Sequence, residues 1–123
     1  MRTRLLGSGI AALTLASLPA LAHHGWSGQG SEPFSVSGKV HKSVSLAGPH
    51  ATMQIQDAQG QVWDITLAPP ARTSGAGLAE DTLAVGAEVT ITGNRNLDAS
   101  RFEVKTMRVT SNGKNYDVYP NRL

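Results

Sequence analysis

The chain has 123 residues, the size of one small domain, which excludes a two-domain enzyme. It has no cysteine, which excludes a disulfide framework, a thiolate metal site and a cysteine nucleophile. Its 11 Lys and Arg against 9 Asp and Glu give a net charge of +2, a balance that invites a nucleic-acid or membrane-surface interpretation.

Residues 1–22 have the pattern of a secretory signal peptide. Arg2 and Arg4 supply the positive start, residues 5–18 form a short apolar stretch, and an Ala-Leu-Ala cleavage pattern ends at Ala22. The alternative, a membrane anchor, needs a longer apolar stretch. We expect cleavage near Ala22, a periplasmic or secreted protein, and no membrane span in the mature chain. Without Arg2 and Arg4 nine basic and nine acidic residues remain, so the basic balance belongs to the signal.

The mature chain begins with an arm and continues as short strands. Residues 23–33 are rich in Gly and Ser and predict an extended arm. Beyond them, apolar and polar residues alternate, which predicts strands with one buried face each. The five main segments are 34–46, 51–56, 62–67, 87–93 and 102–109, and a last strand returns through Tyr116 and Val118.

The residues between these segments predict how the strands connect. Gly38 predicts a bend in the long first strand, and Asn112-Gly113 is a strong two-residue hairpin signal. A change of parity across Lys105-Thr106 predicts a bulge. Residues 71–83 predict one or two helical turns, weakened by internal glycines.

These features together predict an all-β fold, a small five-stranded Greek-key barrel like the oligonucleotide/oligosaccharide-binding (OB) type. One short helical segment lies between strands 3 and 4, and a β-sandwich is the alternative fold. The expected organisation is a signal peptide over 1–22, an N-terminal arm over 23–33 and an OB-like barrel domain over 34–123.

The new amino terminus is the strongest candidate site. An N-terminal His23 offers its α-amine and an imidazole nitrogen to one metal ion, and His24 adds a second imidazole. Copper or zinc accepts such nitrogen ligands, and copper leads the affinity order. His50, expected at the start of the second strand, is a third candidate ligand, and His41 on the first strand would lie near it if the two strands form a hairpin.

Each of these residues has a plainer interpretation. A histidine pair at a cleavage site can be a polar, exposed start, and a strand histidine can be a surface residue. Trp26 either covers the metal site or pins the arm to the barrel. Met53 shares its parity with Ala51 and Ile55, which favours a core position over a copper ligand.

Catalysis and nucleic-acid binding find little support in the sequence. No nucleophile elbow, phosphate-binding loop or carboxylate pair at functional spacing is visible, so we expect a protein that is not an enzyme. Phe34, Trp63 and Phe102 share the parity of the core, which leaves only Trp26, Tyr116 and Tyr119 as surface aromatics. Basic residues either form a local patch or occupy a solvated strand face; they are Lys39, Lys42, Arg101, Lys105 and Arg108. With balanced charge and export, we expect no nucleic-acid partner.

Four stretches of the mature chain carry a family resemblance: His23-His24-Gly25-Trp26, Pro49-His50, the segment from Trp63 to Pro70, and Gly86 ahead of Val89-Thr90-Ile91. With them the chain resembles a family of small exported bacterial proteins of unknown function. The resemblance implies a single OB-like barrel secreted to the periplasm, with His23, His24, Trp26 and His50 at motif positions. Gly48 stands where the family has an asparagine.

Three functions follow from these observations. The first is a periplasmic binding module that holds copper or zinc through His23, His24 and His50. The second is a metal-free module whose barrel surface binds a protein, glycan or small ligand. The third is an oxidative copper enzyme built on the terminal histidine, for which no substrate surface is readable.

Overall fold

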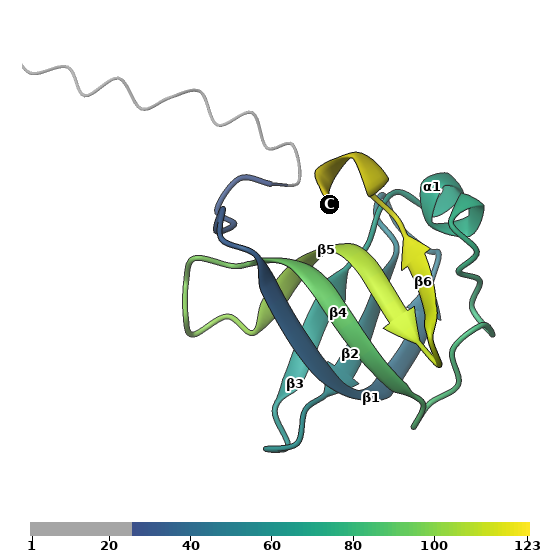
Figure 1. Ribbon diagram of the computed structural model, residues 1–123, viewed down its shortest axis with the longest axis horizontal. Coiled ribbons are helices and arrows are strands. Elements are labelled where there is room, and N and C mark those ends of the chain that lie inside the picture. Colours follow the sequence, from purple (N-terminus) through teal and green to yellow (C-terminus); the bar gives the residue numbers. More distant parts are fainter. Residues whose placement is uncertain (1–25) are drawn as a thin grey trace, which may run out of the picture.

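The computed structural model describes residues 26–123, which form one small barrel (Figure 1). The predicted signal peptide, His23 and His24 lie outside the described residues. The elements are β1 (Phe34–Ser45), β2 (Thr52–Gln56), β3 (Val62–Thr66), α1 (Pro70–Gly75), β4 (Glu88–Arg95), β5 (Glu103–Ser111), β6 (Lys114–Asp117) and a 3-10 turn, η1 (Pro120–Arg122).

The strands close into a barrel, which confirms the predicted fold class. Neighbouring strands follow the order β3-β2-β1-β4-β5, and β3 also pairs with β5 in parallel, so the first and last strands of this order meet. All other pairings are antiparallel. Short α1 connects β3 with β4 as predicted, and β6 extends the sheet beyond β5.

The length and bend of β1 allow it to serve two neighbours. Its first half pairs with β4 and its second half with β2, and the exchange takes place at Lys39, which faces both Glu88 and Gln56. Directly before it, Gly38 approaches the Gln56 carbonyl so closely that a side chain would collide with it. Two register shifts against β2 then coil the strand further. The predicted bend therefore lies where β1 changes partners.

The core has the alternation that the sequence predicts. Inward residues of every barrel strand form one buried cluster, and Met53 is 3% exposed, as its parity predicted. The cluster includes Val40, Val44, Ala51, Ile55, Trp63, Ile65, Leu67, Val89, Ile91, Val104 and Val109. The Asn112-Gly113 hairpin is also confirmed, because both residues have positive φ, as a tight two-residue turn between β5 and β6 requires.

Two sequence predictions need correction. β4 continues past its expected end at Gly93 to Arg95, which pairs with Val104 of β5. Tyr116 was expected on the surface, but it is 8% exposed and belongs to the core cluster. The chain after α1 covers it, since Gly77 lies against the edge of its ring.

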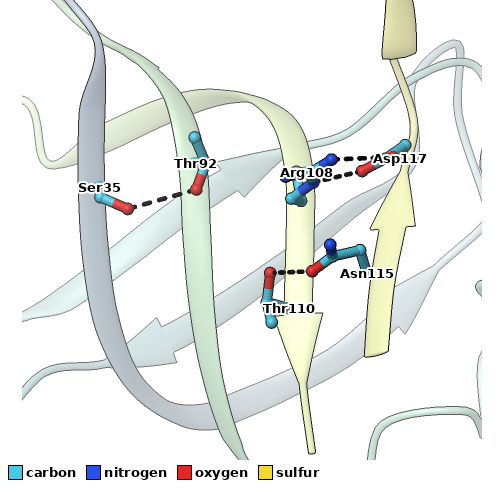
Figure 2. Close-up of polar contacts among 6 residues, drawn as sticks. All are labelled: Ser35, Thr92, Arg108, Thr110, Asn115 and Asp117. Atoms are coloured by element: carbon cyan, nitrogen blue, oxygen red, sulfur yellow. Dashed lines mark hydrogen bonds and ion pairs between the residues drawn. The ribbon is translucent and has the colours of Figure 1, made fainter. Parts of the chain in front are cut away.

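A polar face covers the outside of β1, β4, β5 and β6 (Figure 2). Hydroxyl groups face one another across neighbouring strands, as in Ser35 and Thr92, whose oxygens lie 3.3 Å apart. Arg108 of β5 donates two hydrogen bonds to the carboxylate of Asp117 on β6, at 2.6 and 3.1 Å. Within residues 26–123, no helix has the length and apolar character to cross a membrane.

Candidate functional site

Three distant parts of the chain gather at one end of the barrel, which we call the arm end (Figure 1). The N-terminal arm is tied to the barrel by hydrogen bonds from Gly30 N to Arg95 O and from Leu97 N to Gly28 O. The C-terminal turn η1 packs on β5. The loop from β1 enters β2 beside the end of β3, where Ala51 N donates to Ala68 O.

Lys105 of β5 is the central residue of this end. Its side chain is 2% exposed although it carries an ammonium group. Its Nζ atom donates to the Leu67 carbonyl at 3.3 Å and lies 5.5 Å from the Trp26 ring centroid and 5.4 Å from that of Tyr119. Lys105 is therefore buried between the outside of the barrel and a cover made by the arm and the C-terminal segment.

A bulge places Lys105 in this position. Thr92 pairs with Arg108, but the next residue, Gly93, pairs with Thr106, so Met107 is the extra residue of β5. The predicted bulge is confirmed, although its extra residue is Met107 and not a residue of the predicted Lys105-Thr106 step. At this point Gly93 lies so close to the Lys105 carbonyl that no side chain would fit.

The burial of Lys105 changes its acidity. Burial, together with the charge of Arg122 and against the opposite effect of Glu103, lowers its pKa from 10.5 to about 8. Interaction of the ammonium with the faces of two aromatic rings compensates part of the lost hydration. The charged form of Lys105 is thus destabilised by its burial inside the protein.

Two arginines extend this arrangement. The guanidinium of Arg122 lies 4.1 Å from the Trp26 ring centroid, and that of Arg72 lies 5.3 Å from the Tyr119 ring centroid. The two rings pack edge to face with centroids 5.2 Å apart. We call these five residues the cation–aromatic cluster. Its cations and rings alternate in the order Arg122, Trp26, Lys105, Tyr119, Arg72.

His50 lies at the same end. It precedes Ala51, which exchanges backbone hydrogen bonds with Leu67 and Ala68, and the Leu67 carbonyl accepts from Lys105. Burial lowers the pKa of His50, and the nearby positive charge of Lys105 lowers it further. Both effects favour the neutral imidazole, the form that binds metals. His50 lies in the loop two residues before β2, and not at its first position as predicted.

The expected approach of His41 to His50 is wrong. His41 is the extra residue between Val40 and Lys42, which face Ile55 and Gln54, so it lies well inside the β1–β2 pairing. His50 lies beyond the other end of that pairing, more than about 10 Å away along the strand. Among residues 26–123, no three His, Cys, Asp or Glu side chains come together as a metal site.

Residues 11–105 match the model of a family described as a family of unknown function, DUF6152. The chain belongs to this family. No curated protein matches it.

In this DUF6152 protein the sequence prediction missed the cation–aromatic cluster. Strand parity placed Lys105 on an outward face, where it was expected in a basic patch or in solvent. The parity is right, but the arm and the C-terminal segment cover that face. Trp26 was the only sequence feature that pointed to this cover, since a tryptophan in a polar arm predicts attachment of the arm to the barrel. That prediction agrees with the packing of Trp26 on Tyr119.

Arg108 does not contribute a free positive charge to the predicted basic patch. Its guanidinium is paired with Asp117, and this hydrogen bonding raises the pKa of Arg108 and lowers that of Asp117. No other Lys or Arg within residues 26–123 forms an ion pair, and three of these cations, Arg72, Lys105 and Arg122, gather at the arm end of the barrel. That end can therefore do two things chemically: offer a neutral imidazole at His50, and attract negative charge at the cluster.

Proposed function

We propose that this chain is an exported binding module that holds copper or zinc at the arm end of the barrel. The ligands would be the α-amine and imidazole of His23, the imidazole of His24 and the imidazole of His50. Signal cleavage after Ala22 exposes the amine, which is the first requirement of this site. A bound ion would serve sequestration or delivery.

One observation carries the proposal: Trp26 contacts Lys105, and His50 adjoins Ala51, whose carbonyl accepts from Leu67, the residue that accepts from Lys105. Trp26 packs on the ammonium, and the charge of the ammonium acts on the pKa of His50. Only Gly25 separates Trp26 from His24 in the sequence, and His23 precedes His24 directly. The proposal therefore uses two histidines that are close in the chain to a residue packed at the arm end.

The donor chemistry fits a borderline metal ion. Neutral imidazoles and an amine are nitrogen ligands that copper and zinc accept, and the lowered pKa of His50 keeps its imidazole available. The charge of Lys105 acts against a cation and lowers the affinity that the same ligands would otherwise give. We therefore expect a moderate affinity that depends on the amine.

The experiment compares two forms of the exported chain. Intact mass first establishes that the chain starts at His23, and Cu(II) and Zn(II) are then titrated into this form and into one with an extra glycine before His23. Loss of at least tenfold in affinity in the extended form supports the amine as a ligand. Equal affinity of the two forms would falsify the site.

Substitution of the barrel histidine completes the test. His50→Ala should weaken binding, whereas His41→Ala, which replaces an exposed histidine of β1 away from the arm end, should not. If both variants bind like the parent chain, His50 is not a ligand and the ion is held by the terminus alone.

A metal-free interaction module is the second candidate, and a groove on the polar face favours it. The groove has a volume of about 740 Å³ and lies between the start of β4, the middle of β1 and the β5–β6 turn. Ser37, Thr90 and Thr110 line it with hydroxyl groups, and Lys39 and Glu88 bring charges of both signs. Such a surface suits a hydroxyl-rich ligand such as a glycan.

This candidate predicts an outcome that the metal proposal does not. In titrations with soluble peptidoglycan fragments followed by amide chemical shifts, changes should be confined to groove residues. Joint replacement of His23, His24 and His50 by alanine should leave those changes intact. Absence of saturable shifts in the groove would remove this candidate.

A further inference from the structure

The cation–aromatic cluster has an excess of positive charge that the protein does not neutralise. Arg72, Lys105 and Arg122 converge on two touching rings, with each cation 4.1 to 5.5 Å from a ring centroid. Within residues 26–123 the ion pair is Arg108 with Asp117, so none of the three cluster cations has a carboxylate within 4 Å. Like charges gathered in this way lower stability unless an anion joins them.

Neither residues 1–25 nor Glu103 supplies that anion. Residues 1–25 contain no Asp or Glu, so the segment that leads into Trp26 brings no carboxylate side chain to the cluster. Glu103, the one acid whose charge acts on Lys105, interacts instead with the amide of Gln29 at 3.4 Å. The excess charge is therefore local, in a mature chain whose basic and acidic residues balance.

The buried ammonium has hydrogen-bonding capacity left over. An ammonium group has three N–H donors, and Leu67 O accepts one of them at 3.3 Å. The rings of Trp26 and Tyr119 attract its charge but offer no acceptor oxygen or carboxylate toward it. A negative group near this ammonium would gain more than one near an exposed lysine, because little water screens the interaction.

A hollow beside the cluster has room for such a group. It has a volume of about 450 Å³ and lies between the arm and the outside of β4 and β5. Trp26 and Arg122 are among its lining residues, and Ser31 and Asn94 line it with a hydroxyl and an amide group. Arg122 is exposed, so its planar guanidinium can form paired hydrogen bonds with an arriving oxyanion.

We propose that this hollow binds a small oxyanion, a carboxylate or phosphate group, with Arg122 as its direct partner. Lys105, whose ammonium group lies near the Trp26 ring, supports it by its charge, and Ser31 and Asn94 offer additional donors. The site goes beyond the proposed metal function because it uses none of the three histidines. It also gives the cations of the arm end a role that metal binding does not explain.

The test uses the full mature chain in buffer depleted of metals by a chelating resin, at constant ionic strength set with sodium chloride. Inorganic phosphate is titrated in one arm and acetate in another, and amide and indole chemical shifts are recorded. We expect saturable shifts at the Trp26 indole, Ser31 and Asn94 with at least one of the two anions. The stronger arm tells whether a phosphate or a carboxylate is preferred.

Substitutions decide whether the shifts come from a built site. Arg122→Gln should weaken binding at least tenfold, while Arg101→Gln, an exposed arginine on another loop, should leave it unchanged. Because Arg122 lies on the surface, the variant is expected to fold, and its circular dichroism verifies this. Shifts that rise linearly with anion concentration, or that are equal in both variants, overturn the proposal.

The outcome is separable from that of the metal proposal. His50→Ala and the chain extended before His23 should bind the anion like the parent chain, whatever they do to copper or zinc. If these variants lose the anion while Arg122→Gln keeps it, the anion binds at a place other than Arg122, and the proposal is overturned.

Discussion

The Nζ atom of Lys105 lies 5.5 Å from the centre of the Trp26 ring, although the two residues belong to opposite parts of the chain. The indole and the phenol ring of Tyr119 together close a strand face that would otherwise be open to water. This contact attaches the arm to the barrel and gives the lysine its unusual environment. A ligand that binds at the arm end would therefore bind close to the contact between Lys105 and Trp26.

Removal of the indole should expose the ammonium. We expect Trp26→Ala to lower the free energy of unfolding by roughly 1–3 kcal/mol, because a partly buried ring and its cation–π contacts are lost. Trp26→Phe should recover part of the loss, since a smaller aromatic face remains. Urea unfolding measures both. A change below about 0.5 kcal/mol in the alanine variant would mean that the arm is not held by this contact.

The buried Lys105 should give the protein an alkaline pH dependence. Between pH 8 and 10.5 the folded chain has released this proton while the unfolded chain retains it, so unfolding takes up a proton. Stability should therefore rise with pH across this window, by at most about 3 kcal/mol. Tyr119, whose pKa is raised by burial, stays protonated over most of it.

The control for this dependence is Lys105→Met, which keeps most of the volume and removes the charge. Its free energy of unfolding should be nearly independent of pH between 8 and 10, and at pH 7 it should equal or exceed that of the parent chain. Parallel pH profiles for the two proteins would show that Lys105 does not carry the effect.

The barrel was predictable from the sequence because local patterns determine it. Alternation defined the inward faces of the strands, Asn112-Gly113 defined the last hairpin, and the parity change in β5 defined the bulge. Met53 was assigned to the core on the same grounds. Each of these inferences needs only residues close together in the chain.

The cation–aromatic cluster was not predictable in this way. Parity places Lys105 outside the barrel correctly, but whether an outside face meets water depends on which distant segment covers it. Trp26 and Tyr119 do so from the two ends of the described chain, and no periodicity encodes that meeting. Tyr116 was misjudged for the same reason, because the segment after α1 covers it.

The charge of Lys105 should oppose a metal ion at the proposed histidine site. At pH 7, Lys105→Gln should therefore raise the affinity for Cu(II) by roughly tenfold, about 1.4 kcal/mol. Lys39→Gln removes an exposed charge from the groove and should change little. Isothermal titration of both variants measures the difference. Equal affinities in the two variants would place the ion far from Lys105.

The Arg108–Asp117 pair should support the protein down to acidic pH. Hydrogen bonding to Arg108 lowers the pKa of Asp117 below its ordinary value of 3.8. The stabilisation is therefore complete above pH 3.8 and is lost as the pH falls through the lower, folded-state pKa. Asp117→Asn should reduce the free energy of unfolding at pH 7 and make its further decrease at acidic pH smaller. Asp81→Asn, at an exposed position, is the comparison, and an identical acid limb in both variants would contradict the assignment.

Close packing of two strands should make Gly93 irreplaceable. A methyl group there would collide with the carbonyl of Lys105, in the backbone of the neighbouring strand, so Gly93→Ala must displace β5 at its bulge. We expect a loss of about 2 kcal/mol or more, typical of overpacking, together with changed amide shifts around Lys105. Gly75→Ala is the matched control: a methyl group there meets open space at the end of α1, so stability should stay the same or rise by about 0.5 kcal/mol. Thermal unfolding of both variants measures the contrast, and equal midpoints would show that β4 and β5 can separate at the bulge without loss.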